Sequence, residues 1–153
     1  ASSESRLINA FKSNPGNSTN FMKAIYALGR RGRTNQIKET IEEFASVAGD
    51  DPKKLTLIKN SYGLISHWKE KETIDQRLTK IEPDQYAPWF HLAQTRLQLG
   101  KTNEALSALV RALSIYKNSE TNAIDILASV KTNDLFIPLR ENPKVKPFLK
   151  TEP

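Results

Sequence analysis

Apolar residues recur along this chain at intervals of three and four positions, the spacing that places side chains on one face of an α-helix. The groups that show this spacing lie in residues 21–28, 37–47, 55–65, 74–81, 89–97 and 105–115. No stretch shows the sustained alternation of apolar and polar residues that indicates a β-strand. The pattern therefore predicts an all-α fold.

Residues typical of helix starts and ends separate these groups. Asn17 or Ser18 can cap a helix that begins near Thr19, and Asp51 precedes Pro52 in the order expected at a capped helix start. Other expected caps are Thr34, Asp84 and Thr102, and the expected helix-ending glycines are Gly32, Gly49 and Gly100. The connections are about three to five residues long, so consecutive helices should be antiparallel neighbours.

The pattern itself repeats every 34 residues. Phe21, Leu55 and Trp89 are separated by this interval, and Gly32 and Gly100 by twice this interval. A 34-residue period that contains one helix pair resembles the tetratricopeptide repeat. The likeness is closest in the third repeat, which reads Trp89-x-x-Leu92-Ala93-x-x-Arg96, Gly100, Ala105-x-x-x-Leu109 and Ala112.

The second repeat, residues 52–85, departs most from the family pattern. Lys71 and Asp75 stand where the family has alanine and phenylalanine. We expect the second helix of this repeat to be shifted by a residue, so that it presents Ile74 and Leu78 to the core.

The resemblance implies a single domain over residues 1–153, folded as a right-handed α–α superhelix of antiparallel helix pairs. Its parts would be a half-repeat helix in 1–17, repeats in 18–51, 52–85 and 86–119, and a capping helix and tail in 120–153. Leu7 and Phe11 fall on a face that a preceding helix would cover. We therefore expect the natural chain to continue upstream of residue 1.

The C-terminal region departs from the repeat. One more helix is predicted by Ala123, Ile126, Leu127 and Val130. The stretch Phe136-x-Pro138-Leu139-Arg140-x-x-Pro143-x-Val145 then resembles a tail that often follows bacterial tetratricopeptide arrays. Such a tail would act as a cap and lay Leu135, Phe136, Leu139 and Phe148 over the last exposed groove.

The composition narrows the chemistry. The chain has no cysteine and two histidines, so disulfides, cysteine-ligated metals and a cysteine nucleophile are excluded. Ser66, His67 and Asp75 have the residue types of a catalytic triad, but adjacent residues on one helix cannot face each other. His67 and His91 have no neighbours at metal-ligand spacing, and no phosphate-binding glycine motif is present. We expect no enzyme activity, cofactor or metal.

Charge adds a second consideration, because the net charge is +6. The sharpest basic cluster is Arg30, Arg31 and Arg33. It could bind an anionic partner, or it could complement the dipole of a helix C-terminus, and we favour the second interpretation because three arginines at one turn are too compact to follow a phosphate backbone. Nucleic acid is therefore not an expected partner, whereas an acidic protein would be attracted at long range.

In tetratricopeptide arrays, the first helix of each pair lines a concave groove that holds peptides. The resemblance places in this groove Lys23, Tyr26, Arg30, Lys53, Thr56, Asn60, Leu64, Phe90, His91, Gln94 and Gln98. Phe90 would be an exposed aromatic anchor there. Only Asn60 resembles the Lys/Asn/Lys/Arg set that grips a terminal carboxylate in chaperone adaptors, so that specialised activity is not expected.

The resemblance thus implies a scaffold or adaptor that binds a protein or peptide partner in the groove. The alternative is a non-catalytic helical appendage or oligomerisation arm of a larger, even membrane-anchored, protein. In that case the N-terminal half-repeat would be the edge through which copies associate. No apolar run in this chain reaches the length of a membrane span.

Overall fold

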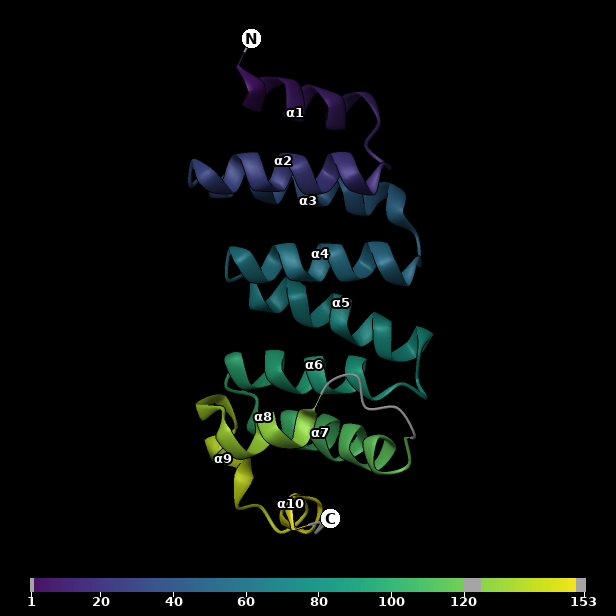
Figure 1. Ribbon diagram of the computed structural model, residues 1–153, viewed down its shortest axis with the longest axis vertical. Helices are drawn as coiled ribbons and strands as arrows, with labels where there is room; N and C mark the ends of the chain where they lie inside the picture. Colours follow the sequence, from purple (N-terminus) through teal and green to yellow (C-terminus); the bar gives the residue numbers. More distant parts are fainter. Residues whose placement is uncertain (1, 120–124, 151–153) are drawn as a thin grey trace. The chain divides into compact units, whose positions relative to one another are not determined.

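The computed structural model describes residues 2–119 and 125–150, and its secondary structure there is helical with no β-strand (Figure 1). The elements are α1 (Ser3–Ser13), α2 (Ser18–Arg30), α3 (Thr34–Ala48), α4 (Pro52–Leu64), α5 (Trp68–Ile81), α6 (Tyr86–Gln98), α7 (Thr102–Lys117), α8 (Ile126–Thr132), η1 (Asp134–Phe136), α9 (Ile137–Arg140) and α10 (Lys146–Leu149). The predicted all-α fold is confirmed, and the superhelix stays a prediction.

The helix starts follow the 34-residue interval found in the sequence. The helices α2, α4 and α6 begin at Ser18, Pro52 and Tyr86. The helices that follow them, α3, α5 and α7, begin at Thr34, Trp68 and Thr102. Each set recurs every 34 residues, so the backbone has the same period as the apolar positions.

The turns inside the three helix pairs share one backbone conformation. Gly32, Ser66 and Gly100 have φ angles of 62°, 57° and 73°. Glycine adopts this left-handed conformation readily at the end of a helix, whereas serine is disfavoured there. Ser66 therefore takes the place of glycine in the turn of the second helix pair, between α4 and α5.

Two of the predicted helix caps are confirmed. Asn17 Oδ1 accepts a hydrogen bond of 2.8 Å from the Asn20 amide, and Asp51 Oδ1 accepts one of 2.9 Å from the Lys53 amide. The caps predicted at Thr34, Asp84 and Thr102 are wrong by one residue. The residues at those N-cap positions are Arg33, Gln85 and Lys101.

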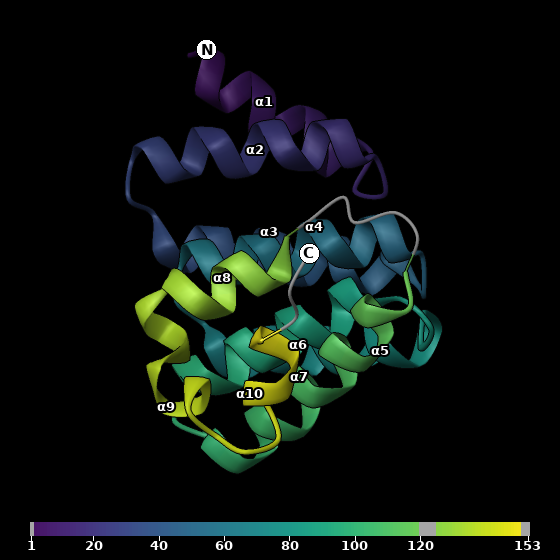
Figure 2. The ribbon, with the colours of Figure 1, turned by 60° about the horizontal axis from the view of Figure 1, so that its bottom comes forward.

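The chain divides into two compact units, Ala1–Ile74 and Asp75–Pro153, with the division inside α5. In the first unit, α1 packs on α2, α2 on α3 and α3 on α4, and α2 also contacts α4 (Figures 1 and 2). The rings of Phe21 and Phe44 stack with centroids 4.0 Å apart, and Phe11 lies 6.0 Å from Phe21. Of the described residues of α1, Phe11 alone is buried.

In the second unit, α6 and α7 form the central helix pair, and the C-terminal segment packs against it. The short helix η1 contacts α6, while α8 and α9 contact α7. The predicted capping side chains lie in this core: Phe136 and Leu139 are buried, and Leu135 and Phe148 are half-buried against it. Residues 126–132 form the expected last helix, whereas Ala123 lies outside the described residues.

The prediction that Ile74 and Leu78 of α5 face the core is confirmed, since both side chains are buried. Asp75 is buried as well, at the position where the family has phenylalanine, with 1% of its surface exposed. Its Oδ2 accepts a hydrogen bond of 2.6 Å from the Thr95 hydroxyl. A polar pair therefore occupies a buried position in the second compact unit.

Candidate functional site

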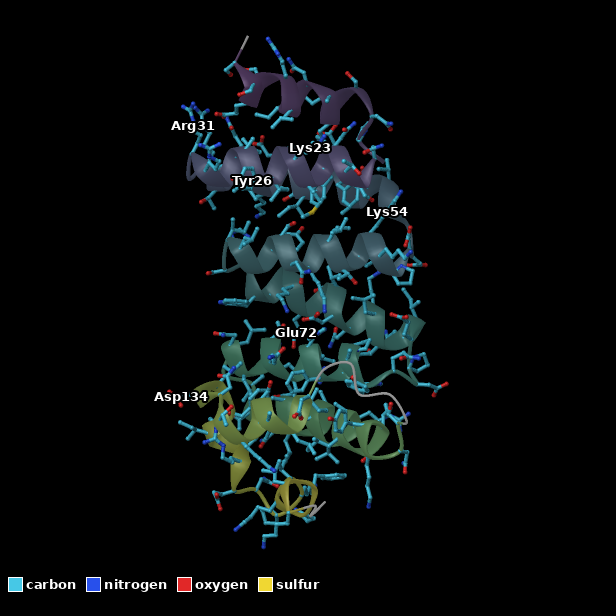
Figure 3. The ribbon with its side chains drawn as sticks, viewed as in Figure 1. Lys23, Tyr26, Arg31, Lys54, Glu72 and Asp134 are labelled. Carbon is cyan, nitrogen blue, oxygen red and sulfur yellow. The ribbon has the colours of Figure 1, made fainter. Side chains whose placement is uncertain are left out.

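The first unit carries an apolar groove with a volume of about 520 Å³. Its walls are α2, the start of α3 and the end of α4, and Figure 3 shows Tyr26 on α2. The lining residues are Met22, Ile25, Tyr26, Gly29, Arg30, Gly32, Thr34, Ile37, Leu64 and Ile65. Most of these side chains are apolar, which is typical of a binding surface and not of a solvated one.

Three large apolar side chains at the groove are exposed. Met22, Tyr26 and Leu64 have 45%, 67% and 72% of their surface accessible. Met22 and Tyr26 are one helical turn apart, beside the face of α2 that the core buries. Covering such side chains would contribute about 25 cal/mol for each Å² of apolar surface removed from water.

The floor of the groove belongs to the core. Ile25 and Ile37 are 3% and 4% exposed, so packed side chains support the floor from below. A Cβ atom at Gly29 or Gly32 would meet open space beyond the neighbouring backbone, so the absence of a side chain leaves room in the groove there. The floor of the groove is therefore part of the packed core of the first unit.

The groove has one sign of charge. Among the described residues that line it, Arg30 is the only one with a charged side chain. The Arg30 guanidinium lies 5.8 Å from the centroid of the Tyr26 ring, within the range of a cation–π interaction. This contact holds the cation over the groove wall.

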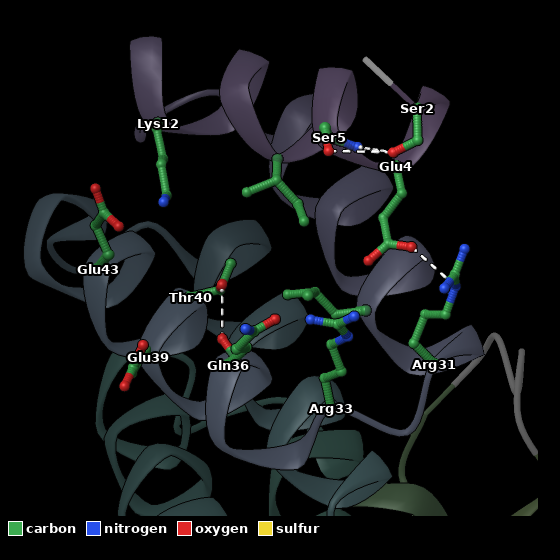
Figure 4. Close-up of a pocket in the computed structure, with 12 residues that line it drawn as sticks. Ser2, Glu4, Ser5, Lys12, Arg31, Arg33, Gln36, Glu39, Thr40 and Glu43 are labelled. Carbon is green, nitrogen blue, oxygen red and sulfur yellow. Dashed lines mark hydrogen bonds and ion pairs between the residues drawn. The ribbon is translucent and has the colours of Figure 1, made fainter.

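The other two arginines of the basic cluster do not line the groove, and Arg31 lines a smaller pocket of about 260 Å³ together with Arg30 and Glu4. Arg31 Nε lies 3.0 Å from Glu4 Oε2, an ion pair that ties the end of α2 to α1. Both Arg31 and Arg33 line a polar pocket of about 380 Å³ between α1 and α3 (Figure 4). The cluster therefore does not form one anionic site.

That polar pocket carries charges of both signs. Its charged lining residues are Glu4, Lys12, Arg31, Arg33, Glu39 and Glu43. Figure 4 shows Glu4 reaching Arg31 on one side of the pocket, and Lys12 and Glu43 near each other on the other side. Because acids and bases are interspersed, the pocket selects no charge class of ligand.

The structure brings three of the predicted groove residues together, namely Tyr26, Arg30 and Leu64. Other predicted residues of the first unit, Lys23, Lys53, Thr56 and Asn60, lie outside the described lining of this groove. In the second unit, His91 and Gln94 are half-buried and Gln98 is exposed.

The prediction that Phe90 is an exposed groove anchor is wrong. Its side chain is 3% exposed and stacks on Phe136 of η1, with ring centroids 5.3 Å apart and planes 16° apart. The C-terminal segment folds over the face of α6 that carries Phe90, and so removes this side chain from solvent.

Sequence reasoning missed Met22 and Ile65 as groove residues. Met22 precedes Tyr26 by four residues, so helical spacing alone could have placed both on one stripe. Ile65 is the C-cap residue of α4 and ends the apolar group in residues 55–65. Its side chain is half-buried at the groove edge.

The residues with catalytic side chains are not among the described lining of this groove. Ser66 is in a turn, Asp75 is buried against Thr95, and His67 Nδ1 lies 2.8 Å from Glu70 Oε2. Among the described residues, no group of three or more histidine, aspartate or glutamate side chains is arranged to hold a metal ion. Within residues 2–119 and 125–150, no helix combines the length and apolar character needed to cross a membrane.

Comparison with known proteins does not extend these observations. The sequence matches none of the models of known protein families, and a search of curated proteins finds no significant match.

Proposed function

We propose that this chain is a protein–protein interaction module of tetratricopeptide-like helix pairs and that it holds a segment of a partner protein in the apolar groove of the first unit. The observation that carries the proposal is the group of exposed apolar side chains, Met22, Tyr26 and Leu64, above a buried floor. Such an apolar surface with one charged residue suits a short peptide.

The helix-pair assignment is supported by the period of the backbone. The helix starts recur every 34 residues in both sets of helices, and the left-handed turn residues Gly32, Ser66 and Gly100 recur with them. In such an array the first helix of each pair carries the binding residues, and α2 and α4 are first helices. The groove is lined by α2, the start of α3 and the end of α4.

The proposal is tested with random-sequence peptides displayed on phage and selected on the full chain. The binding variant is Tyr26→Ala with Leu64→Ser, two changes at exposed side chains that leave the core intact. The matched control is Val47→Ser, because Val47 is an apolar side chain of the same unit that is 52% exposed and does not line the groove.

Selected peptides are expected to lose at least about tenfold in affinity for the double variant and to keep it for Val47→Ser. Circular dichroism checks that helicity is unchanged in both. Equal binding to the double variant and the parent chain would refute the groove as the binding site.

The alternative, an oligomerisation arm, makes a different prediction in light scattering. If the chain is an oligomerisation arm, its average mass should rise with protein concentration. Displayed peptides should then bind the Tyr26/Leu64 double variant and the parent chain equally. A concentration-independent mass together with groove-dependent peptide binding favours the interaction module.

A further inference from the structure

We infer that the segment bound in this groove carries a bulky apolar side chain and, about two residues away from it, an acidic side chain. The apolar side chain lies against Met22, and the carboxylate pairs with the Arg30 guanidinium beside the Tyr26 ring. This inference rests on the proposed function, and it names the chemistry of the partner at that same site.

The second unit shows what covers this face of a first helix. Phe90 of α6 follows Met22 of α2 by two repeat lengths, so both hold the same position in their helix pairs. Met22 is 45% exposed, whereas Phe90 is 3% exposed because the Phe136 ring stacks on it. The same position on α2 is open, and a bulky apolar side chain from another protein would fill it in the same way.

Charge distinguishes the open face from the covered one. Arg30 in α2 corresponds to Gln98 in α6, so the first unit has a cation where the second has a neutral amide. The described lining of the groove holds no acidic side chain; Glu4, which shares a neighbouring pocket with Arg30, is paired with Arg31 at 3.0 Å. A carboxylate from the partner would make charge-assisted hydrogen bonds with this guanidinium, whereas a lysine or arginine would be repelled.

The geometry sets the spacing between the two partner side chains. Met22 and Tyr26 are four helical residues apart, about 6 Å along the axis of α2. The Arg30 guanidinium lies over the Tyr26 ring and not at the far end of the helix. An extended peptide advances about 3.3 Å per residue, so the acid and the apolar residue are separated by about two positions.

The chain contains a segment with this spacing, which provides a probe. Asp134, Leu135 and Phe136 place an acid two residues before an aromatic ring. In this protein Phe136 is fully buried in its own unit, so the segment is committed to α6. The occupant we infer is therefore a different protein with similar chemistry, and not a second copy of this chain.

The probe is a fluorescein-labelled peptide with the sequence of residues 132–139, T-N-D-L-F-I-P-L. Three variant peptides carry Asp134→Asn, Asp134→Lys or Phe136→Ala. Fluorescence anisotropy measures their binding to the full chain, to its Arg30→Gln variant and to Lys53→Gln. The last is the charge-matched control, because Lys53 is exposed on α4 and lies outside the groove lining.

The parent peptide is expected to bind about fivefold more weakly after either Asp134→Asn in the peptide or Arg30→Gln in the protein. Making both changes should weaken binding little beyond either one alone, since each removes the same pair. Phe136→Ala in the peptide should reduce affinity at least about tenfold. Lys53→Gln should change affinity by less than about twofold.

Several results would overturn the inference. One is that the probe does not bind, and another is that Arg30→Gln weakens the parent and Asp134→Asn peptides equally. A concentration-dependent dimer that Tyr26→Ala abolishes would identify a second copy as the occupant and would also refute it.

The phage selection separates this inference from the proposed function. If the selected peptides depend on Tyr26 and Leu64 but carry no acid near their apolar residue, the inference is wrong and the groove still binds peptides. If no selected peptide depends on those side chains, the proposed function itself fails.

Discussion

The hydroxyl of Thr95 donates a hydrogen bond of 2.6 Å to Oδ2 of Asp75, and both residues are 1% exposed. This bond joins α5 to α6 within the second unit. A buried carboxylate is costly unless donors satisfy it, so the unit depends on this hydroxyl more than on an ordinary surface hydrogen bond.

Replacing Thr95 by valine is expected to lower the free energy of unfolding by about 1–3 kcal/mol, because the buried Asp75 carboxylate then loses this hydroxyl donor while the size of the side chain at 95 is kept. Urea denaturation followed by circular dichroism measures the change. The matched control is Thr73→Val, since Thr73 is an exposed threonine on α5, and it should stay within about 0.5 kcal/mol. Equal effects of the two substitutions would contradict the assigned role.

The Phe90–Phe136 stack should hold the C-terminal segment on α6. Phe136→Ala is expected to cost about 3–5 kcal/mol, because it removes a fully buried ring. A double-mutant cycle with Phe90→Ala should give a coupling of about 0.5–1.5 kcal/mol. Ile137→Ala is the control, since Ile137 is 57% exposed in the same segment. Zero coupling would show that the two rings contribute independently.

Ser66 occupies a left-handed position that glycine holds in the other two helix pairs, with φ of 57°. Ser66→Gly should therefore raise the free energy of unfolding by about 0.5–1 kcal/mol, since glycine avoids the steric clash of a Cβ atom in this conformation. Gly100 has a φ of 73°, so Gly100→Ala should lower the free energy of unfolding. Thermal unfolding measures both, and a destabilised Ser66→Gly variant would contradict the argument.

Alkaline pH should weaken the protein partly through Tyr62. Burial raises the pKa of Tyr62 above its ordinary value of 10.0, and the carboxylates of Glu42 and Glu70 raise it further. The folded state thus holds this proton more tightly than the unfolded chain. The resulting stability is complete below the unfolded pKa and is lost as the pH rises through the raised folded value.

The measurement is denaturant stability as a function of pH between about 9 and 11. In Tyr62→Phe the alkaline loss should be smaller than in the parent chain, because this titration is absent. Tyr26→Phe is the control, since the Tyr26 ring is 67% exposed. An identical pH profile for Tyr62→Phe and the parent would contradict the predicted linkage.

The sequence allowed the helices to be predicted because helical periodicity is a local property. Buried positions such as Phe21, Phe44 and Leu109 follow directly from spacing of three and four residues. The Asn17 and Asp51 caps could be predicted for the same reason, since a cap bonds residues two or three positions away. Ser66 was harder to interpret, because its left-handed backbone carries no glycine signal.

The repeat register predicts which side chains are neighbours only where no distant part of the chain folds back onto them. Tyr26, Arg30 and Leu64 were placed by that register and do line the groove. Phe90 has the same kind of position, but its burial depends on Phe136, a residue far along the chain that folds back onto α6. No local pattern around Phe90 records that contact.

The attachment of α1 has a consequence for hydrogen exchange. Of the described residues in this helix, Phe11 alone is buried, and its ring lies 6.0 Å from the Phe21 ring at an angle of 52°. One aromatic side chain gives a helix of this length little resistance to local opening. The amide protons of α1 should therefore exchange at low denaturant concentration, well before those of α2 and α3. Phe11→Leu should speed the exchange of α1 and leave the midpoint of global unfolding nearly unchanged.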